Sequence, residues 1–168
     1  MKKKLVYQYK KFIKVFRLNI NNKYVKVKNF HRIELNDATM AVVQNTSTKK
    51  ILLLKEYRIG FDKVCFGLPG GFVNTGEKHL NAIKRECAEE LGINIKKVKK
   101  ICSYIRNGNY YGGVETVFSA KTDETEIKTE NQVDYIWASN KRLISLIKEG
   151  KFGTPGLLAA ILYHLNVN

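Results

Sequence analysis

The segment from Gly71 to Ile93 constrains the fold most, because it carries both a helical apolar stripe and a group of carboxylates. On a helix that turns by about 100° per residue, apolar side chains three and four positions apart share one face, which must pack on a core. The stripe consists of Leu80, Ile83, Cys87 and Leu91. The acids on the adjacent flank are Glu86, Glu89 and Glu90. This pattern predicts a helix over residues 77–91 with its acids at the edge of the buried face.

The grouped acids need a balancing charge, because like charges at this spacing destabilise a helix by about a few tenths of a kcal/mol. Hard divalent cations prefer oxygen ligands, and Mg²⁺ keeps several waters while it bridges to substrate phosphates. From the helix alone, two interpretations stand. One is a divalent-metal site, and the other is a solvated acidic face balanced by Lys78, Lys84 and Arg85.

The chain has the size and composition of one globular domain, with 168 residues, of which 44% are hydrophobic and 27% charged. No stretch approaches the roughly 18 apolar residues of a membrane span. Lysines within residues 10–14 interrupt the apolar region that a secretion signal needs. Cys65, Cys87 and Cys102 lack metal-binding or redox spacing. We therefore expect three buried thiols, a cytoplasmic location and no membrane partner.

Charge is unevenly distributed along this chain of net charge +15, since no Asp or Glu precedes Glu34. A basic field attracts phosphates, nucleic acid or anionic lipid. The alternative is a compositional bias that spreads solvated lysines along the chain, because these lysines alternate with apolar residues and form no tract.

The order of local patterns predicts an α+β fold. Alternating apolar residues indicate a hairpin with a turn at Asn21 and Asn22, then two strands around a polar turn at 45–48. A Gly/Pro-rich loop or short strand precedes the acidic helix. Strands follow over 96–107, 114–121 and 133–139. Ser139 or Asn140 and then Pro155 mark the starts of two final helices.

The spacing around the acidic helix is Gly71, five residues, Glu77, seven residues, and then the run from Arg85 to Ile93. It resembles the Nudix box, the signature of hydrolases that act on a nucleoside diphosphate linked to another group. All seven fixed positions are present, and Cys87 stands where the family prefers a larger aliphatic residue. The resemblance implies an α/β/α sandwich with a mixed sheet. It also implies a Nudix catalytic domain over 37–168, after an N-terminal β segment at 1–36.

The resemblance also implies roles for the residues of the box. Glu86, Glu89 and Glu90 look like ligands of Mg²⁺, for which Mn²⁺ can substitute, and Gly71 would add its backbone carbonyl. Arg85 resembles the partner of Glu77 in an internal charge pair that orients the catalytic loop and helix. Gly92 would end the helix in a left-handed conformation.

Residues outside the box resemble the ADP-ribose pyrophosphatase branch of the family. They are "KEYRIG" followed by "FGLPGGFVNTGE", together with the strand–helix–helix tail. By this resemblance Arg58 would approach a substrate phosphate or the terminal ribose, and the N-terminal segment would mediate a homodimer. Two departures are Gly67, where the branch has a glutamate, and the lack of proline in the loop after the box.

That loop supplies further candidates. Glu115 follows two glycines, where related enzymes place a general base or an additional ligand, and the alternative is a surface residue that starts a strand. Tyr110 and Tyr111 either stack on a base or ribose or pack against the protein. Glu124, Glu126 and Glu130 are expected to form a solvated connection. His31, His79 and His164 lack the sequence neighbours of a metal or nucleophilic site.

These residues together predict an Mg²⁺-dependent hydrolase that cleaves ADP-ribose or a similar nucleoside diphosphate sugar to a nucleoside monophosphate and a sugar phosphate. Alternative substrates are NADH, a dinucleoside polyphosphate or an RNA 5′ end. The basic N-terminus gives RNA some support, but a nucleic-acid partner is not favoured. A non-catalytic nucleotide-sensing regulator is the least favoured alternative, because the box is complete.

Overall fold

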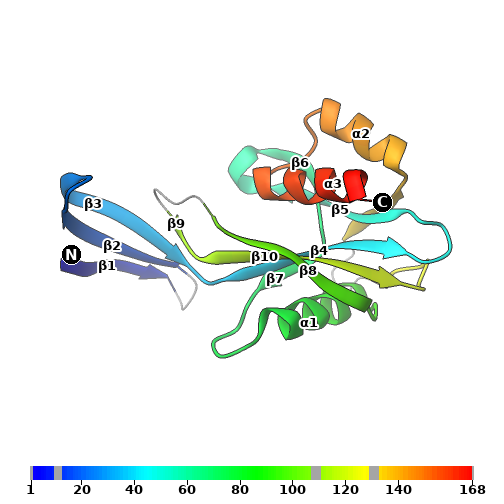
Figure 1. Cartoon of the computed structure of the whole chain (residues 1–168), viewed down its shortest axis with the longest axis horizontal. Coiled ribbons are helices and arrows are strands. Elements are labelled where there is room, and N and C mark those ends of the chain that lie inside the picture. Colours follow the sequence, from blue (N-terminus) through cyan, green and yellow to red (C-terminus); the bar gives the residue numbers. More distant parts are fainter. Residues whose placement is uncertain (1, 10–12, 107–110, 129–132, 168) are drawn as a thin grey trace.

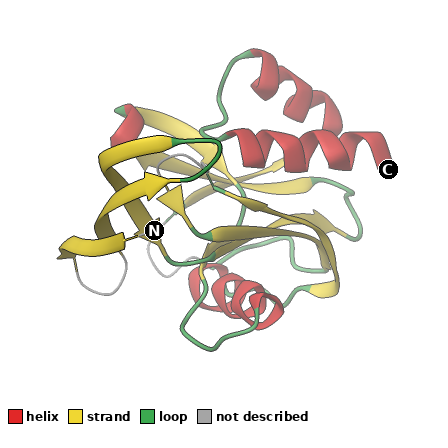
Figure 2. Ribbon diagram, turned by 60° about the vertical axis from the view of Figure 1, so that its left-hand side comes forward, coloured by secondary structure: helices red, strands yellow, loops and turns green. Residues whose placement is uncertain are grey.

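The computed structural model describes residues 2–9, 13–106, 111–128 and 133–167, and its helices cover a central sheet from both sides. In Figure 1, α1 (His79–Leu91) lies below the sheet, and α2 (Asn140–Lys148) and α3 (Pro155–Val167) lie above it. Figure 2 shows the same three layers after rotation. The predicted α+β fold, an α/β/α sandwich with a mixed sheet, is confirmed.

The first three strands form an antiparallel sheet that projects from the sandwich (Figure 1). They are β1 (Lys2–Tyr9), β2 (Ile13–Asn21) and β3 (Lys26–Leu35). In the turn between β2 and β3, the Asn22 side chain accepts hydrogen bonds from the amides of Tyr24 and Val25, at 2.8 and 2.9 Å. Asparagine favours such a turn because its side chain satisfies amides two and three residues ahead. The predicted hairpin is confirmed.

The central sheet has the strand order β11-β5-β4-β10-β8, with β6 paired to β5 and β7 paired to β4. Its strands are β4 (Ala38–Asn45), β5 (Ile51–Arg58), β6 (Lys63–Gly67), β7 (Gly70–Phe72), β8 (Lys96–Ile105), β10 (Val114–Thr122) and β11 (Asp134–Ala138). A short 3-10 turn (Ile59–Phe61) separates β5 from β6. Because β4 and β10 are parallel and the other neighbours are antiparallel, the sheet is mixed.

Two chain passages join the projecting sheet to the central one. β3 leads into β4 across Asn36 and Asp37, and the two-residue strand β9 (Tyr111–Gly112) leads into β10 across Gly113. Gly113 has a φ of +113°, and a Cβ there would lie 3.0 Å from both the Leu35 carbonyl oxygen and an Arg106 nitrogen. The second passage therefore needs glycine.

Each face of the central sheet buries its own apolar core. Alternate residues of one strand point to opposite faces, so Val42 and Leu53 pack under α2 and α3, whereas Val43 and Leu52 pack against α1. Burial on both faces accounts for the uninterrupted apolar runs in β4 and β5.

Two expectations about buried residues are wrong. Leu80 is 41% exposed, because it lies in the first turn of α1 beside a surface groove, and Ala82 joins Ile83, Cys87 and Leu91 on the buried face instead. Cys102 is exposed on β8, which lies at the edge of the sheet, whereas Cys65 and Cys87 are buried as predicted. No helix in the described ranges is both long and apolar enough to cross a membrane.

Gly92→Ala is expected to lower the free energy of unfolding by about 1–2 kcal/mol, because Gly92 ends α1 at φ +62°. Its Cβ would also lie 3.2 Å from the Lys128 carbonyl oxygen. Gly150→Ala is the matched control, with φ +63° and open space around the new Cβ. Urea unfolding should show the larger loss for Gly92→Ala, and equal losses would contradict a contribution from the crowded carbonyl.

Candidate functional site

A cleft of ≈ 690 Å³ opens where the first residues of β4, β10 and α3 meet β5, β6, β7 and α1. Seven charged side chains line it: Glu56, Arg58, Arg85, Glu86, Glu90, Arg106 and Glu115. The structure thus brings together five charged residues that the sequence singled out, along with Gly71. Glu56 and Arg106 were missed as site residues.

Two glycines let β7 approach both β4 and the acidic helix. A Cβ at Gly71 would lie 2.5 Å from the carboxyl carbon of Glu86, so a side chain there would displace that carboxylate. Gly70 has a φ of +154°, and its Cβ would lie 2.1 Å from the Thr39 carbonyl oxygen of β4. The close approach holds the backbone of Gly71 beside Glu86.

The guanidinium of Arg85 connects the loop before α1 to the acids of the helix. Its Nε and Nη2 atoms donate to the two carboxylate oxygens of Glu77, each at 3.0 Å. Nη2 also donates to the Phe72 carbonyl at 3.1 Å, and Nη1 donates to Glu86 at 2.8 Å and to Glu89 at 3.0 Å. Hydrogen bonding from Arg85 lowers the pKa of Glu77. The expected pairing of Arg85 with Glu77 is present.

Glu90 lies among other negative charges. Burial, together with the nearby charges of Glu86 and Glu56, raises the pKa of its carboxyl group to about 7. A group at its pKa is half protonated, so the protein alone does not fully stabilise the negative charge of Glu90 near neutral pH. Glu56 reaches this group from β5, across the cleft from α1.

Glu89 lies apart from this pair. Its side chain is 60% exposed, it binds the Arg85 guanidinium, and it does not line the cleft. Within the described ranges, no three Asp, Glu, His or Cys side chains are arranged as a ready-made metal site. The structure therefore brings Glu86 and Glu90 together and holds Glu89 at Arg85.

The donors around Glu86 fit a hard divalent cation. Two carboxylates and an adjacent backbone offer the oxygen atoms that Mg²⁺ and Mn²⁺ prefer. The raised pKa of Glu90 marks an excess of negative charge that a bound cation would relieve. The absence of a side chain at Gly71 keeps the Glu86 carboxylate in place.

Arg58 and Glu56 form an ion pair at the end of β5. The pair occupies space beside Gly67 of β6, where a Cβ would lie 3.1 Å from a Glu56 oxygen and 3.3 Å from an Arg58 nitrogen. The resemblance places a glutamate at position 67. Glu56 brings a carboxylate to the same space from the neighbouring strand, where it is paired with Arg58.

Arg106 supplies a second guanidinium, directly after β8. Its Nη2 donates to the Asn36 carbonyl oxygen, and its guanidinium carbon lies 5.7 Å from the centre of the Phe72 ring. The sequence signal for Arg106 is its position at a strand end before a glycine-containing loop, where functional residues often lie. That signal alone does not show that the strand ends at the cleft.

Glu115 lies in β10, within the strand predicted over 114–121, opposite Ala38 of β4 and Tyr104 of β8. The Tyr104 hydroxyl donates a hydrogen bond to its carboxylate. Burial and this hydrogen bond raise the pKa of Tyr104, so the hydroxyl remains a donor at neutral pH. Gly156 at the start of α3 makes room, because a Cβ there would lie 1.7 Å from the Tyr104 oxygen.

The other candidates lie elsewhere. Tyr110 and Glu130 are outside the described residues, and only the backbone of Tyr111 is described, in β9. Glu124 accepts hydrogen bonds from the Thr122 hydroxyl and the Asn94 amide and does not line the cleft. His79 Nε2 lies 3.6 Å from an Asp37 oxygen, a pairing that the sequence did not indicate.

The sequence is similar to those of known proteins. The model of the family described as the NUDIX domain matches residues 34–159. An ADP-ribose pyrophosphatase of Methanocaldococcus jannaschii is 38% identical over 95 residues, which cover 52% of this chain and 55% of that protein. An ADP-ribose pyrophosphatase of Bacillus subtilis is 28% identical over 82 residues, which cover 49% and 44% of the two chains. The chain spans about half the length of these curated relatives.

Glu90→Gln is expected to stabilise the metal-free protein at pH 8. The pKa of Glu90 is about 7 in the folded protein and 4.5 ordinarily, so ionisation of Glu90 costs stability as the pH rises from 4.5 through 7. Glutamine removes that cost. Because Glu90 is partly exposed, we expect a gain on the order of 1 kcal/mol at pH 8 that disappears near pH 4.5.

Urea unfolding in EDTA at both pH values measures this difference, with Glu126→Gln on the surface as the matched control. Addition of Mg²⁺ at pH 8 should then stabilise the wild type more than Glu90→Gln. A variant that loses stability equally at both pH values would contradict the assigned charge repulsion. An unchanged response to Mg²⁺ would contradict Glu90 as a ligand.

Proposed function

Because the chain belongs to the NUDIX domain family, we propose that it hydrolyses the diphosphate of ADP-ribose or of a similar nucleoside diphosphate sugar. The products would be a nucleoside monophosphate and a sugar phosphate. The observation that carries the proposal is the cleft in which Glu86 and Glu90 lie with the guanidinium of Arg58. Carboxylates suit a divalent cation, and guanidinium groups suit phosphate oxygens. The names of the two relatives support this substrate class.

Glu86, Glu90 and the backbone carbonyl of Gly71 would hold Mg²⁺, or Mn²⁺ in its place. Glu89 would join them only after it releases Arg85, to which it is hydrogen-bonded. When bound, the cation polarises the diphosphate oxygens, lowers the pKa of the attacking water and neutralises the leaving group. Arg85 acts through Glu86, which it orients, and makes its contacts within the protein.

Glu115 is the proposed acceptor of the proton from the attacking water. Its carboxylate lines the cleft and is held by the Tyr104 hydroxyl. Arg58, at the end of β5, and Arg106, directly after β8, would both bind the oxygen atoms of the diphosphate. Tyr110 and Tyr111 remain the proposed contacts to the base or ribose.

Glu86→Gln is expected to lower turnover in Mg²⁺ by on the order of 100-fold or more, because it removes a carboxylate from the metal while its shape is kept. The assay incubates the protein with ADP-ribose, other nucleoside diphosphate sugars, NADH, a dinucleoside polyphosphate and a 5′-triphosphorylated RNA, and identifies the products chromatographically. Glu126→Gln should retain full activity, and circular dichroism should show both variants folded.

The products discriminate between the alternatives. AMP from ADP-ribose, with little turnover of the other compounds, supports the proposed substrate. If the RNA is turned over fastest and this activity falls steeply as the salt concentration rises, RNA is the substrate and the proposal of ADP-ribose is contradicted. If the wild type turns over no compound, hydrolysis is contradicted and a nucleotide-sensing role is favoured. Unchanged activity in Glu86→Gln would overturn the metal site.

We also propose that residues 1–36 form a unit distinct from the catalytic domain at 37–168 and mediate a homodimer. The sheet β1-β2-β3 projects from the sandwich (Figure 1). Large apolar side chains are exposed on this sheet and on its β2–β3 turn, including Tyr7 of β1 at 57% and Tyr24 of the turn at 83%. Exposed apolar groups of this kind are typical of protein interfaces.

Substitution of Tyr7 and Tyr24 by serine is expected to shift a dimer towards monomer, because it removes apolar area from the proposed interface. Sedimentation velocity over a range of concentrations measures the shift. Leu162→Ser, which alters an exposed residue of α3, is the control and should leave the dimer intact. A monomeric wild type at every concentration would contradict the proposal.

A further inference from the structure

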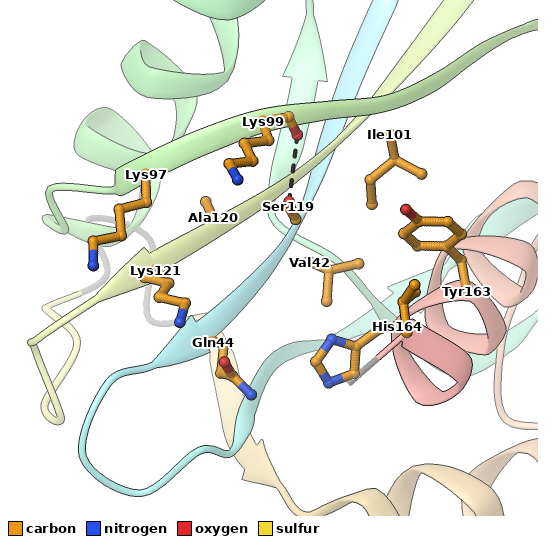
Figure 3. A pocket seen from close by; sticks show the side chains of 11 residues that line it. Val42, Gln44, Lys97, Lys99, Ile101, Ser119, Ala120, Lys121, Tyr163 and His164 are labelled. Atoms are coloured by element: carbon orange, nitrogen blue, oxygen red, sulfur yellow. Dashed lines mark hydrogen bonds between the residues drawn. The ribbon is translucent and has the colours of Figure 1, made fainter.

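A second cavity, of ≈ 400 Å³, lies at the other end of α3 from the cleft. Thr154 and Leu157 at the start of the helix line the cleft, whereas Tyr163 and His164 near its end line the second cavity. The remaining walls come from the last residues of β4 and β10 and the first residues of β8 (Figure 3). The cavity therefore lies on the face of the sheet that α3 covers, and α3 extends from the cleft to the cavity.

Three lysines gather at this cavity. Lys97 and Lys99 extend from β8, and Lys121 extends from the adjacent β10 (Figure 3). None of the described residues that line the cavity is an Asp or a Glu. The first acid after β10, Asp123, is bound to Lys96 at 2.5 Å. The amino groups around the cavity thus form a concentration of positive charge without a carboxylate in the lining.

A bulge in the pairing of β8 with β10 contributes to this arrangement. Ser119 lies opposite Lys99 and Lys121 lies opposite Lys96, with a register shift between the two pairs. Lys97, within the bulge, has a φ of +50°, a left-handed conformation that costs a non-glycine residue about 1–2 kcal/mol. Bulges of this kind redirect side chains and often lie next to functional sites.

The other lining residues combine hydrogen-bonding groups with apolar walls. The Ser119 hydroxyl donates to the Lys99 carbonyl at 3.5 Å (Figure 3), and the Gln44 amide donates one hydrogen to the Lys49 carbonyl at 3.2 Å. The second amide hydrogen of Gln44 and the Tyr163 hydroxyl are the neutral donors that these bonds do not use. His164 is 6% exposed, and burial lowers the pKa of its imidazole, so the ring is neutral near pH 7 and has one N–H donor. Val42 and Ile101 form apolar walls beside the Tyr163 ring (Figure 3).

We propose that this cavity binds a small phosphate-bearing ligand of nucleotide size, at a site separate from the proposed active site. Lysines and neutral donors without carboxylates suit the oxygen atoms of a phosphate. The apolar walls and the ring of Tyr163 suit a planar base. The cavity volume lies within the range of about 300–1,000 Å³ that is typical of small-molecule sites. The proposal does not depend on the reaction in the cleft.

Titration with AMP and, separately, with inorganic pyrophosphate tests the proposal. The full chain, labelled with ¹⁵N, is titrated in EDTA while amide shifts are followed at Ala120 and His164 in the cavity and at Glu86 in the cleft. We expect saturable shifts at the cavity amides. Lys99→Gln with Lys121→Gln should weaken this binding by about tenfold. Lys26→Gln with Lys28→Gln, on β3, is the charge-matched control and should leave it unchanged.

The two ligands distinguish the sources of affinity. Equal binding of pyrophosphate and AMP supports a site that recognises the phosphate alone. Tighter binding of AMP, lost in Tyr163→Ala, supports recognition of the base as well. Shifts confined to the cleft, or equal weakening by both lysine pairs, would overturn the proposal. The proposal would also be overturned if Lys99→Gln with Lys121→Gln lowered the thermal stability but left the affinity for both ligands unchanged. The lysines would then stabilise the negative C-terminal end of the α3 dipole and would not bind a ligand.

Discussion

The hydrogen bonds of Arg85 are the interaction on which the site depends. A guanidinium has five N–H groups, and each of those of Arg85 has an acceptor in Glu77, Glu86, Glu89 or the Phe72 carbonyl. These acceptors come from β7, the following loop and α1. Because every donor is used, Arg85 would have to break an internal bond to contact a substrate. Its contacts therefore favour a positioning role, which fixes Glu86 against Gly71.

The electrostatics of the cleft differ from those of the chain. The chain has a net charge of +15, yet four carboxylates and three guanidinium groups line this cleft. Burial and the neighbouring carboxylates raise the pKa of Glu90, and Glu56 contributes to this rise from β5. The Glu56 carboxylate occupies the space beside Gly67, where the resemblance implies a glutamate. A concentration of acids within a basic protein suits a cation in the cleft and a phosphate near it.

The parts of the fold that sequence predicts well are those that neighbouring residues determine. The turn at Asn22, the left-handed Gly92 and the Arg85–Glu77 pair all depend on spacing within a short segment. Leu80 and Cys102 were misplaced because their exposure depends on where an element starts or which strand lies at an edge. Glu56 and Arg106 were missed because their approach to Glu90 and Glu115 depends on strand pairing between distant segments. The three lysines of the second cavity were hidden for the same reason, in a chain where lysine is common.

The residues of the cleft divide by how firmly the fold holds them. Glu86 is fixed by Arg85 and by the missing side chain at Gly71, and Glu115 is fixed by strand pairing and by Tyr104, for which Gly156 leaves room. Arg58, in contrast, has a 51% exposed side chain and pairs only with Glu56 among the ion pairs of the described chain. Preorganised groups are effective where charge develops in a reaction, because they need no rearrangement. The rigid carboxylates thus suit the proposed metal-assisted hydrolysis, and the less constrained Arg58 suits its proposed role in recognising a particular substrate.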